Sequence, residues 1–242
     1  MSSVESSLNQ TLATSTEAQQ TPRVGAVVAE TPSFAKSLAD VVASSTNEHG
    51  VRSSKRTAII HNCISSYMTH RNPDIRCVVE HSLSTMMGDF KVDIAVFIGD
   101  VLVACLLFKG LTSSISKNEK NYEHNKLGEA MKAKTGMSKT AKLVYLDVVP
   151  IRCPTYKTDD SIGAWESHLP ESVRERNDTL RKVANMDRVV PLIDDIYTVS
   201  VDYEYMSRSE IAVKTVVDDS DLIRFEAFLT GLVPPEGMSS SA

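Results

Sequence analysis

Residues 92–110 read VDIAVFIGDVLVACLLFKG, two apolar runs that are separated by a glycine and an aspartate. A glycine next to an acidic residue between apolar runs predicts a tight turn, although the usual order of the two residues is reversed here. The stretch therefore predicts two antiparallel strands, 91–98 and 101–109, joined as a hairpin. Strands joined in this way bring the start of the first and the end of the second close together.

Helical and strand-like segments occur on both sides of this hairpin. Apolar periodicity predicts the helices, and short apolar runs predict the strands. The expected helices are 57–70, 118–134, 165–186 and 221–229, with a shorter helical segment at about 74–86, and the further expected strands are 142–149, 189–193 and 197–205. Because both kinds of element are spread along the chain, we expect an α/β (or α+β) fold, a central mixed β-sheet flanked by helices.

The composition divides the 242 residues into one folded body and two polar ends. Residues 1–30 are rich in Ser, Thr, Gln, Ala and Glu, and such a segment buries too little surface to offset its chain entropy. We expect a disordered or weakly structured arm over 1–55, in which 33–44 could form a short helix. A single domain over 56–232, long enough for one hydrophobic core, and a flexible tail over 233–242 complete the chain.

The charge of the chain is mildly acidic, since 26 lysines and arginines against 31 aspartates and glutamates give a formal net charge of −5. This excludes a protein that is basic throughout, but it leaves room for a local basic patch that binds nucleic acid. The four cysteines form no CxxC pair, and no HExxH, GxxxxGK[ST], GxGxxG or GxSxG motif occurs. Zinc sites, ATP-driven activity, dinucleotide binding and α/β-hydrolase chemistry therefore find no support.

The sequence contains no run of 18 or more apolar residues, the length that a membrane-spanning helix requires. Its beginning lacks the charged-then-apolar pattern of a signal peptide. The widely spaced cysteines are typical of reduced thiols in an intracellular protein. These features predict a soluble, cytoplasmic protein that makes no contact with a membrane.

Two residues at the ends of the predicted hairpin suit phosphodiester cleavage. Asp93 opens the first strand, and a carboxylate binds Mg²⁺ (or Mn²⁺) through oxygen. A bound ion of this kind polarises a phosphate and lowers the pKa of a water. Lys109 closes the second strand, and a lysine there can orient or activate that water or stabilise charge in the transition state. The alternative is structural, because acids and lysines are also common at exposed sheet edges.

The helix that follows this hairpin carries a polar face. Its asparagines recur at helical spacing with a tyrosine, and Glu129 and Lys132 continue the same stripe. Asparagine is a mediocre helix former, but Asn and Lys side chains bind phosphate oxygens and base edges. A solvated helix face is the alternative, with Leu127, Ala130 and Met131 on the core side. The residues expected to contact nucleic acid are Lys117, Asn118, Asn121, Tyr122 and Asn125.

The order of an aspartate strand, a hairpin, a lysine strand and a helix of the form S-x-x-K-N-x-x-N-x-x-x-N-x-x-G-E resembles the PD-(D/E)xK nuclease superfamily. It is most similar to type II restriction-endonuclease-like members, over about residues 75–152. The resemblance implies that Asp93 is the metal-binding aspartate and Lys109 the catalytic lysine of a Mg²⁺-dependent DNA endonuclease. It also implies cleavage that leaves a 5′-phosphate, and it suggests a homodimer. RNA remains open as a substrate.

The sequence departs from the pattern of the superfamily at one position. Its second acidic residue should lie two positions before the lysine, where this chain has Leu107, and an apolar side chain cannot ligate a metal. One explanation is that the acid has moved to a neighbouring element, for which Glu80 is the best candidate as a metal ligand and catalytic residue. The other is a catalytically inactive nuclease fold that binds nucleic acid or serves in assembly.

Overall fold

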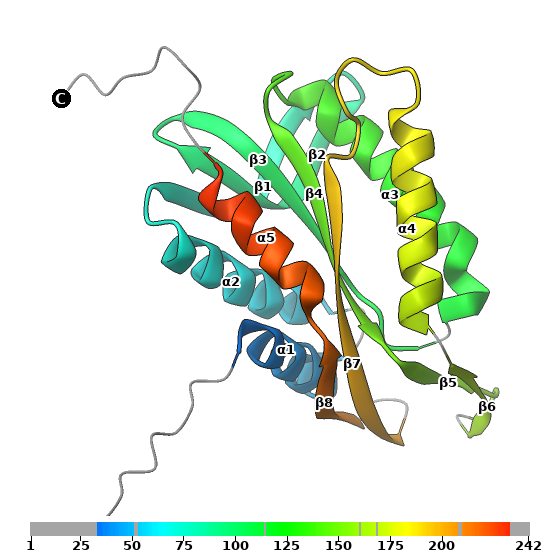
Figure 1. The fold of residues 1–242 in the computed structure, drawn as a ribbon. Helices are drawn as coiled ribbons and strands as arrows, with labels where there is room; N and C mark the ends of the chain where they lie inside the picture. Colours follow the sequence, from blue (N-terminus) through cyan, green and yellow to red (C-terminus); the bar gives the residue numbers. More distant parts are fainter. Residues whose placement is uncertain are drawn as a thin grey trace, which may run out of the picture. The chain divides into compact units, whose positions relative to one another are not determined.

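A six-stranded sheet with helices on both faces forms the chain's three-layered body (Figure 1). The computed structural model describes residues 33–50, 53–113, 115–159, 161–167, 169–207 and 210–232. Most of the predicted polar arm and the predicted tail lie outside these residues. The predicted fold class, a mixed sheet flanked by helices, is confirmed.

The main sheet has the strand order β1-β2-β3-β4-β7-β8. β1, β2 and β3 form an antiparallel meander, β3, β4 and β7 run parallel, and β8 returns antiparallel to β7. Its strands are β1 (Ile75–Thr85), β2 (Gly88–Ile98), β3 (Val101–Gly110), β4 (Lys142–Pro150), β7 (Asp195–Ser207) and β8 (Glu210–Asp218). A separate two-stranded sheet pairs β5 (Arg152–Tyr156) with β6 (Ile162–Ser167).

The central strands are buried on both faces because their sequences are almost continuously apolar. In β3, every residue from Val103 to Phe108 is buried. The predicted hairpin is confirmed, with Ile98 of β2 paired to Val101 of β3. Gly99 starts the turn between them with a φ of 56°, a left-handed conformation that a residue without a Cβ adopts readily.

Helices cover the two faces of the main sheet in two groups. The first face packs against α1 (Phe34–His49), α2 (Ser54–Arg71) and α5 (Ser220–Thr230), and the second against α3 (Ile115–Gly136) and α4 (Leu169–Asn185). Adjacent residues of β3 serve the two faces, since Leu106 joins the core under α1 and α2 whereas Leu107 joins the core under α3. None of the helices in the described ranges is long and apolar enough to cross a membrane.

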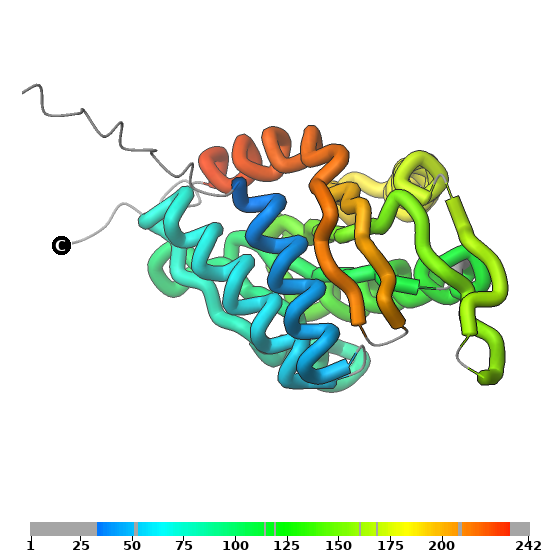
Figure 2. The backbone as a smooth tube through the Cα atoms, turned by 90° about the horizontal axis from the view of Figure 1, so that it is seen from below, coloured from blue at the N-terminus to red at the C-terminus, as the bar shows by residue number. Residues whose placement is uncertain are grey.

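The folded body begins earlier than the predicted boundary at residue 56. The expected short helix over 33–44 is instead the first part of α1, which extends to His49 and buries Leu38 and Val42 completely. Figure 2 shows α1 lying between α2 and β8, two elements that it contacts. The arm expected over residues 1–55 therefore contributes a core helix.

Other elements also differ from those predicted. Within the expected helical segment over 74–86, residues Ile75–Thr85 form strand β1 instead, because they pair with β2. The predicted strand over 189–193 does not form; the Asn185 side chain bonds the backbone of Leu192 and Ile193 in its place. β8 and the β5–β6 hairpin were not predicted.

The burial of α1 leads to a stability prediction. Replacing Leu38 by alanine leaves a cavity in the core, so we expect the free energy of unfolding in urea to fall by about 2–5 kcal/mol. The exposed Ser44 of the same helix provides the control, since Ser44→Ala should change it by less than about 0.5 kcal/mol. Equal, small effects of the two substitutions would show that α1 is not part of the folding unit.

Candidate functional site

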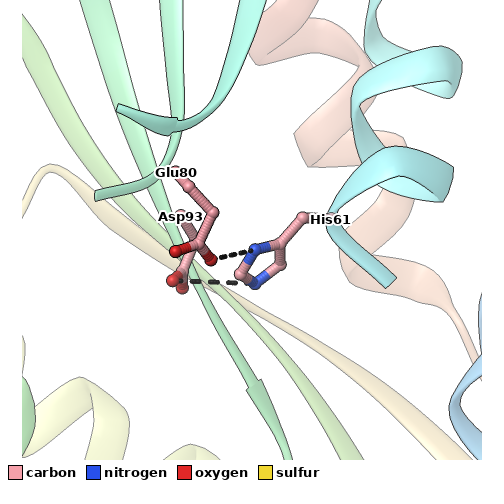
Figure 3. Close-up of side chains that lie close together, drawn as sticks. All are labelled: His61, Glu80 and Asp93. Atoms are coloured by element: carbon pink, nitrogen blue, oxygen red, sulfur yellow. Dashed lines mark ion pairs between the residues drawn. The ribbon is translucent and has the colours of Figure 1, made fainter. Parts of the chain in front are cut away.

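Three side chains from α2, β1 and β2 bring potential metal ligands together. One ligand atom from each of His61, Glu80 and Asp93 lies within 4.8 Å of the others. His61 Nδ1 is 3.2 Å from Glu80 Oε1, and His61 Nε2 is 3.6 Å from Asp93 Oδ1. Figure 3 shows both carboxylates turned toward the imidazole ring, which projects from the helix. We refer to these three residues as the triad.

Glu80 and Asp93 lie opposite one another in the β1–β2 ladder. The register pairs Val79 with Ile94 and His81 with Val92, which places the two acidic residues face to face. Like charges directly opposite on neighbouring strands destabilise a sheet. Glu80 also has a φ of 56°, a left-handed conformation that costs a non-glycine residue about 1–2 kcal/mol. Strained residues of this kind cluster at functional sites.

His61 reaches the two carboxylates from the buried side of α2. Its helix neighbours Ile60 and Ile64 are core residues, and this stripe carries His61 inward to an exposure of 1%. The imidazole packs edge-on to the Phe108 ring, with the ring centroids 6.3 Å apart. Its two nitrogens therefore face Glu80 and Asp93 from a position that the core fixes.

Asp93 is held from the side of β3 as well. Its Oδ2 accepts a hydrogen bond of 2.6 Å from the backbone N–H of Phe108. Burial raises the pKa of the Asp93 carboxyl; His61, this hydrogen bond and Lys109 oppose the rise, and Glu129 adds to it. A carboxylate that is poorly solvated in this way gains from a nearby cation.

The structure brings together the three predicted catalytic residues. Lys109 lies near enough to Asp93 to act on its charge, as the hairpin implies, and Glu80 faces Asp93 from β1. The Lys109 ammonium donates a hydrogen bond of 2.8 Å to Glu129 Oε1 on α3. Leu107, by contrast, is 2% exposed within the apolar core under α3, so this position supplies no metal ligand.

The predicted nucleic-acid face of α3 is divided in the structure. Tyr122 is partly buried against a small core that includes Leu111 and Ile115, and Asn118 is half-buried. Met131, assigned to the core side by its spacing, is 46% exposed, because the helix turns Lys126 inward. The predicted contact residues that remain exposed are Lys117, Asn121 and Asn125.

Sequence reasoning missed two parts of this region. His61 has no histidine or cysteine partner at a metal-site spacing, since its partners are carboxylates on two later strands, and only the fold brings them together. A buried cluster was missed as well: Lys126 contacts Asp147 of β4 and bonds Asn177 of α4 at 2.8 Å. Asn177 Nδ2 in turn donates to Asp147 at 3.0 Å. A buried lysine has no sequence signal on a helix this rich in charge.

The raised pKa of Asp93 leads to a prediction about stability and pH. Below the ordinary aspartate value of 3.8 the carboxyl is protonated in both the folded and the unfolded chain, and above its raised folded pKa burial of the charge costs stability. Asp93→Asn should therefore raise the melting temperature of the metal-free protein at pH 7, and the gain should disappear as the pH falls toward 3.8. Asp100→Asn, in the exposed β2–β3 turn, is the control. A lower melting temperature for Asp93→Asn at pH 7 would contradict this account.

Comparison with known proteins gives no relatives: no protein-family model matches the chain, and no curated protein or solved structure is significantly similar to it. The functional assignment therefore depends on the chemistry of the triad and its neighbours.

Proposed function

We propose that the chain is a metal-dependent endonuclease that hydrolyses phosphodiester bonds in DNA. The observation that carries this proposal is the convergence of His61, Glu80 and Asp93, with Lys109 near enough to act on the charge of Asp93. The sheet also follows the order of an aspartate strand, a hairpin, a lysine strand and a helix, for which the sequence resembles the PD-(D/E)xK superfamily. Glu80 provides the acidic ligand that Leu107 does not.

The donor atoms of the triad suit a divalent cation. Carboxylates bind Mg²⁺ and Mn²⁺ through oxygen, and the added imidazole nitrogen favours Mn²⁺ over the harder Mg²⁺. A cation between Glu80 and Asp93 would remove the repulsion of two opposed carboxylates. His61 binds a metal only as the neutral imidazole; when protonated, it is itself a counter-ion for both carboxylates. When bound, the ion supplies phosphate polarisation and a more acidic water.

The chain's own residues supply the remaining chemistry. Lys109 is near enough to act on the charge of Asp93, and from there its ammonium can orient the attacking water and offset the negative charge that grows on the phosphate. Water attacks the phosphorus and forms a new P–O bond while the bond from phosphorus to the 3′-oxygen breaks. One strand then ends in a 3′-hydroxyl, which takes up a proton, and the other in a 5′-phosphate. Lys117, Asn121 and Asn125, the exposed part of the predicted face, provide donors for the DNA backbone.

The setting of the enzyme is part of the same proposal. We place it in the cytoplasm, because the four cysteines of the chain, Cys63, Cys77, Cys105 and Cys153, form no disulfide with one another. We also propose a homodimer, because a palindromic duplex offers two equivalent strands to a symmetric pair of sites.

A second candidate function is a catalytically inactive fold that binds nucleic acid or serves in assembly. The buried Leu107 favours it, because one expected acidic ligand of the superfamily is lost and its place is filled by core packing. In that case the triad would hold β1, β2 and α2 together through the contacts of His61 with both carboxylates, without a metal.

Cleavage of supercoiled plasmid with Mg²⁺ or Mn²⁺ tests the proposal. Wild type should cut, more strongly with Mn²⁺. Lys109→Ala should lower the rate by at least about 100-fold, the scale of lost acid–base catalysis, and Asp93→Ala should also abolish most cleavage because it removes a metal ligand. Asp100→Ala and Lys91→Ala change exposed residues of the same charge and should cut like wild type.

The outcome that contradicts the nuclease is equally clear. If wild type binds DNA or RNA but cuts neither with either ion, the inactive fold is the correct assignment. A parallel assay on single-stranded RNA decides between DNA and RNA as substrate.

A further inference from the structure

We propose that Glu129 is a positioning residue, which holds the Lys109 ammonium in place beside the triad; this inference rests on the proposed nuclease function. Lys109 Nζ and Glu129 Oε1 are 2.8 Å apart, and both side chains are about three-quarters buried. A lysine side chain is long and flexible, so its ammonium needs a fixed acceptor to remain at one point. Glu129 provides that acceptor from the helix opposite β3.

Glu129 can serve as a fixed acceptor because α3 is anchored to the sheet one turn before it. The Tyr145 hydroxyl of β4 donates a hydrogen bond of 2.7 Å to the backbone carbonyl of Lys126. The Lys126 side chain forms a buried ion pair with Asp147, also on β4. Residues three apart lie on the same helix face, so Lys126 and Glu129 both face the strands. Asp147 of β4 is also the register partner of Lys109 on β3, so α3 contacts two neighbouring strands at the same level of the sheet.

The contacts of Glu129 assign it to the lysine. Its carboxylate also raises the pKa of Asp93, as a neighbouring like charge. Among the residues that the structure describes, the group of clustered ligand atoms consists of the triad and does not include Glu129. Glu129 Oε1 accepts a hydrogen bond from the Lys109 ammonium, and the Tyr145 side chain of β4 interacts with the same carboxylate.

Steady-state cleavage and metal titration of the full chain test this role. A displacement of about 1 Å costs about 100-fold in rate, so Glu129→Ala should lower kcat by about that factor. Glu129→Gln keeps an oxygen acceptor in the same place and should restore most of the loss. KM for DNA and the Mn²⁺ affinity, measured by calorimetry, should stay at the wild-type value in both variants. Glu175→Ala, at an exposed glutamate of α4, is the control.

Two results would overturn the positioning role while leaving the nuclease intact. If Glu129→Ala cleaves with the wild-type kcat, the lysine does not need Glu129. If it loses Mn²⁺ affinity, Glu129 is a metal ligand. The melting temperatures of both variants show whether a lost rate reflects unfolding. If Glu129→Ala is unfolded, the rate of Glu129→Gln, which preserves the shape of the side chain, decides whether Glu129 positions Lys109.

A measurement without cleavage separates this inference from the proposed function. An ammonium held by a partly buried carboxylate exchanges its protons slowly and gives a resolved ¹⁵Nζ resonance, assigned to Lys109 by its loss in Lys109→Arg. That resonance should disappear in Glu129→Ala. If the resonance persists in Glu129→Ala, Glu129 does not hold Lys109, whether or not the protein is a nuclease. If the resonance disappears but the wild-type protein cuts neither DNA nor RNA, the nuclease function is refuted and the contact between Glu129 and Lys109 is not.

Discussion

The site depends on one electrostatic constraint, the face-to-face placement of Glu80 and Asp93 across the β1–β2 ladder. Two opposed carboxylates repel, and Asp93 is also buried enough for its pKa to rise. Folding retains this arrangement together with a left-handed backbone at Glu80, so the surrounding contacts must stabilise it. The imidazole of His61, fixed by the core and within 4 Å of both carboxylates, is one group that can do so. A divalent cation would satisfy the same constraint more completely.

The two faces of the sheet supply different residues to the site. On one face, α2 brings His61 to the carboxylates from a largely apolar core. On the other face, α3 brings Glu129 to Lys109 and is tied to β4 through Lys126 and its partners. The β2–β3 hairpin connects the two sides of the site. Asp93 of β2 accepts a hydrogen bond from the backbone N–H of Phe108, and Lys109 is the next residue of β3. Rigid elements of this kind hold reacting groups more accurately than loops do.

The central hairpin was predictable because its signal is local: two apolar runs, a turn and a polar residue at each far end. β1 was not, because its mixture of polar and apolar residues matches neither period well, and pairing with β2 decides its state. Glu80 was predicted as a ligand on that expected helical segment, and its position opposite Asp93 follows only from the strand. His61 carries no sequence signal, because tertiary structure alone brings it to residues on β1 and β2. The asparagine stripe of α3 predicted one polar face, but core packing at Tyr122 divides it.

Crystals grown with Mn²⁺ and measured for anomalous scattering at the manganese edge test the central claim most directly, namely that His61, Glu80 and Asp93 together hold one divalent ion. The account predicts an anomalous peak bounded by His61 nitrogen and by oxygens of Glu80 and Asp93. A triad that carries no peak in Mn²⁺-saturated crystals, with His61 still between the two carboxylates, would contradict the metal site and leave a histidine-bridged, structural cluster in its place.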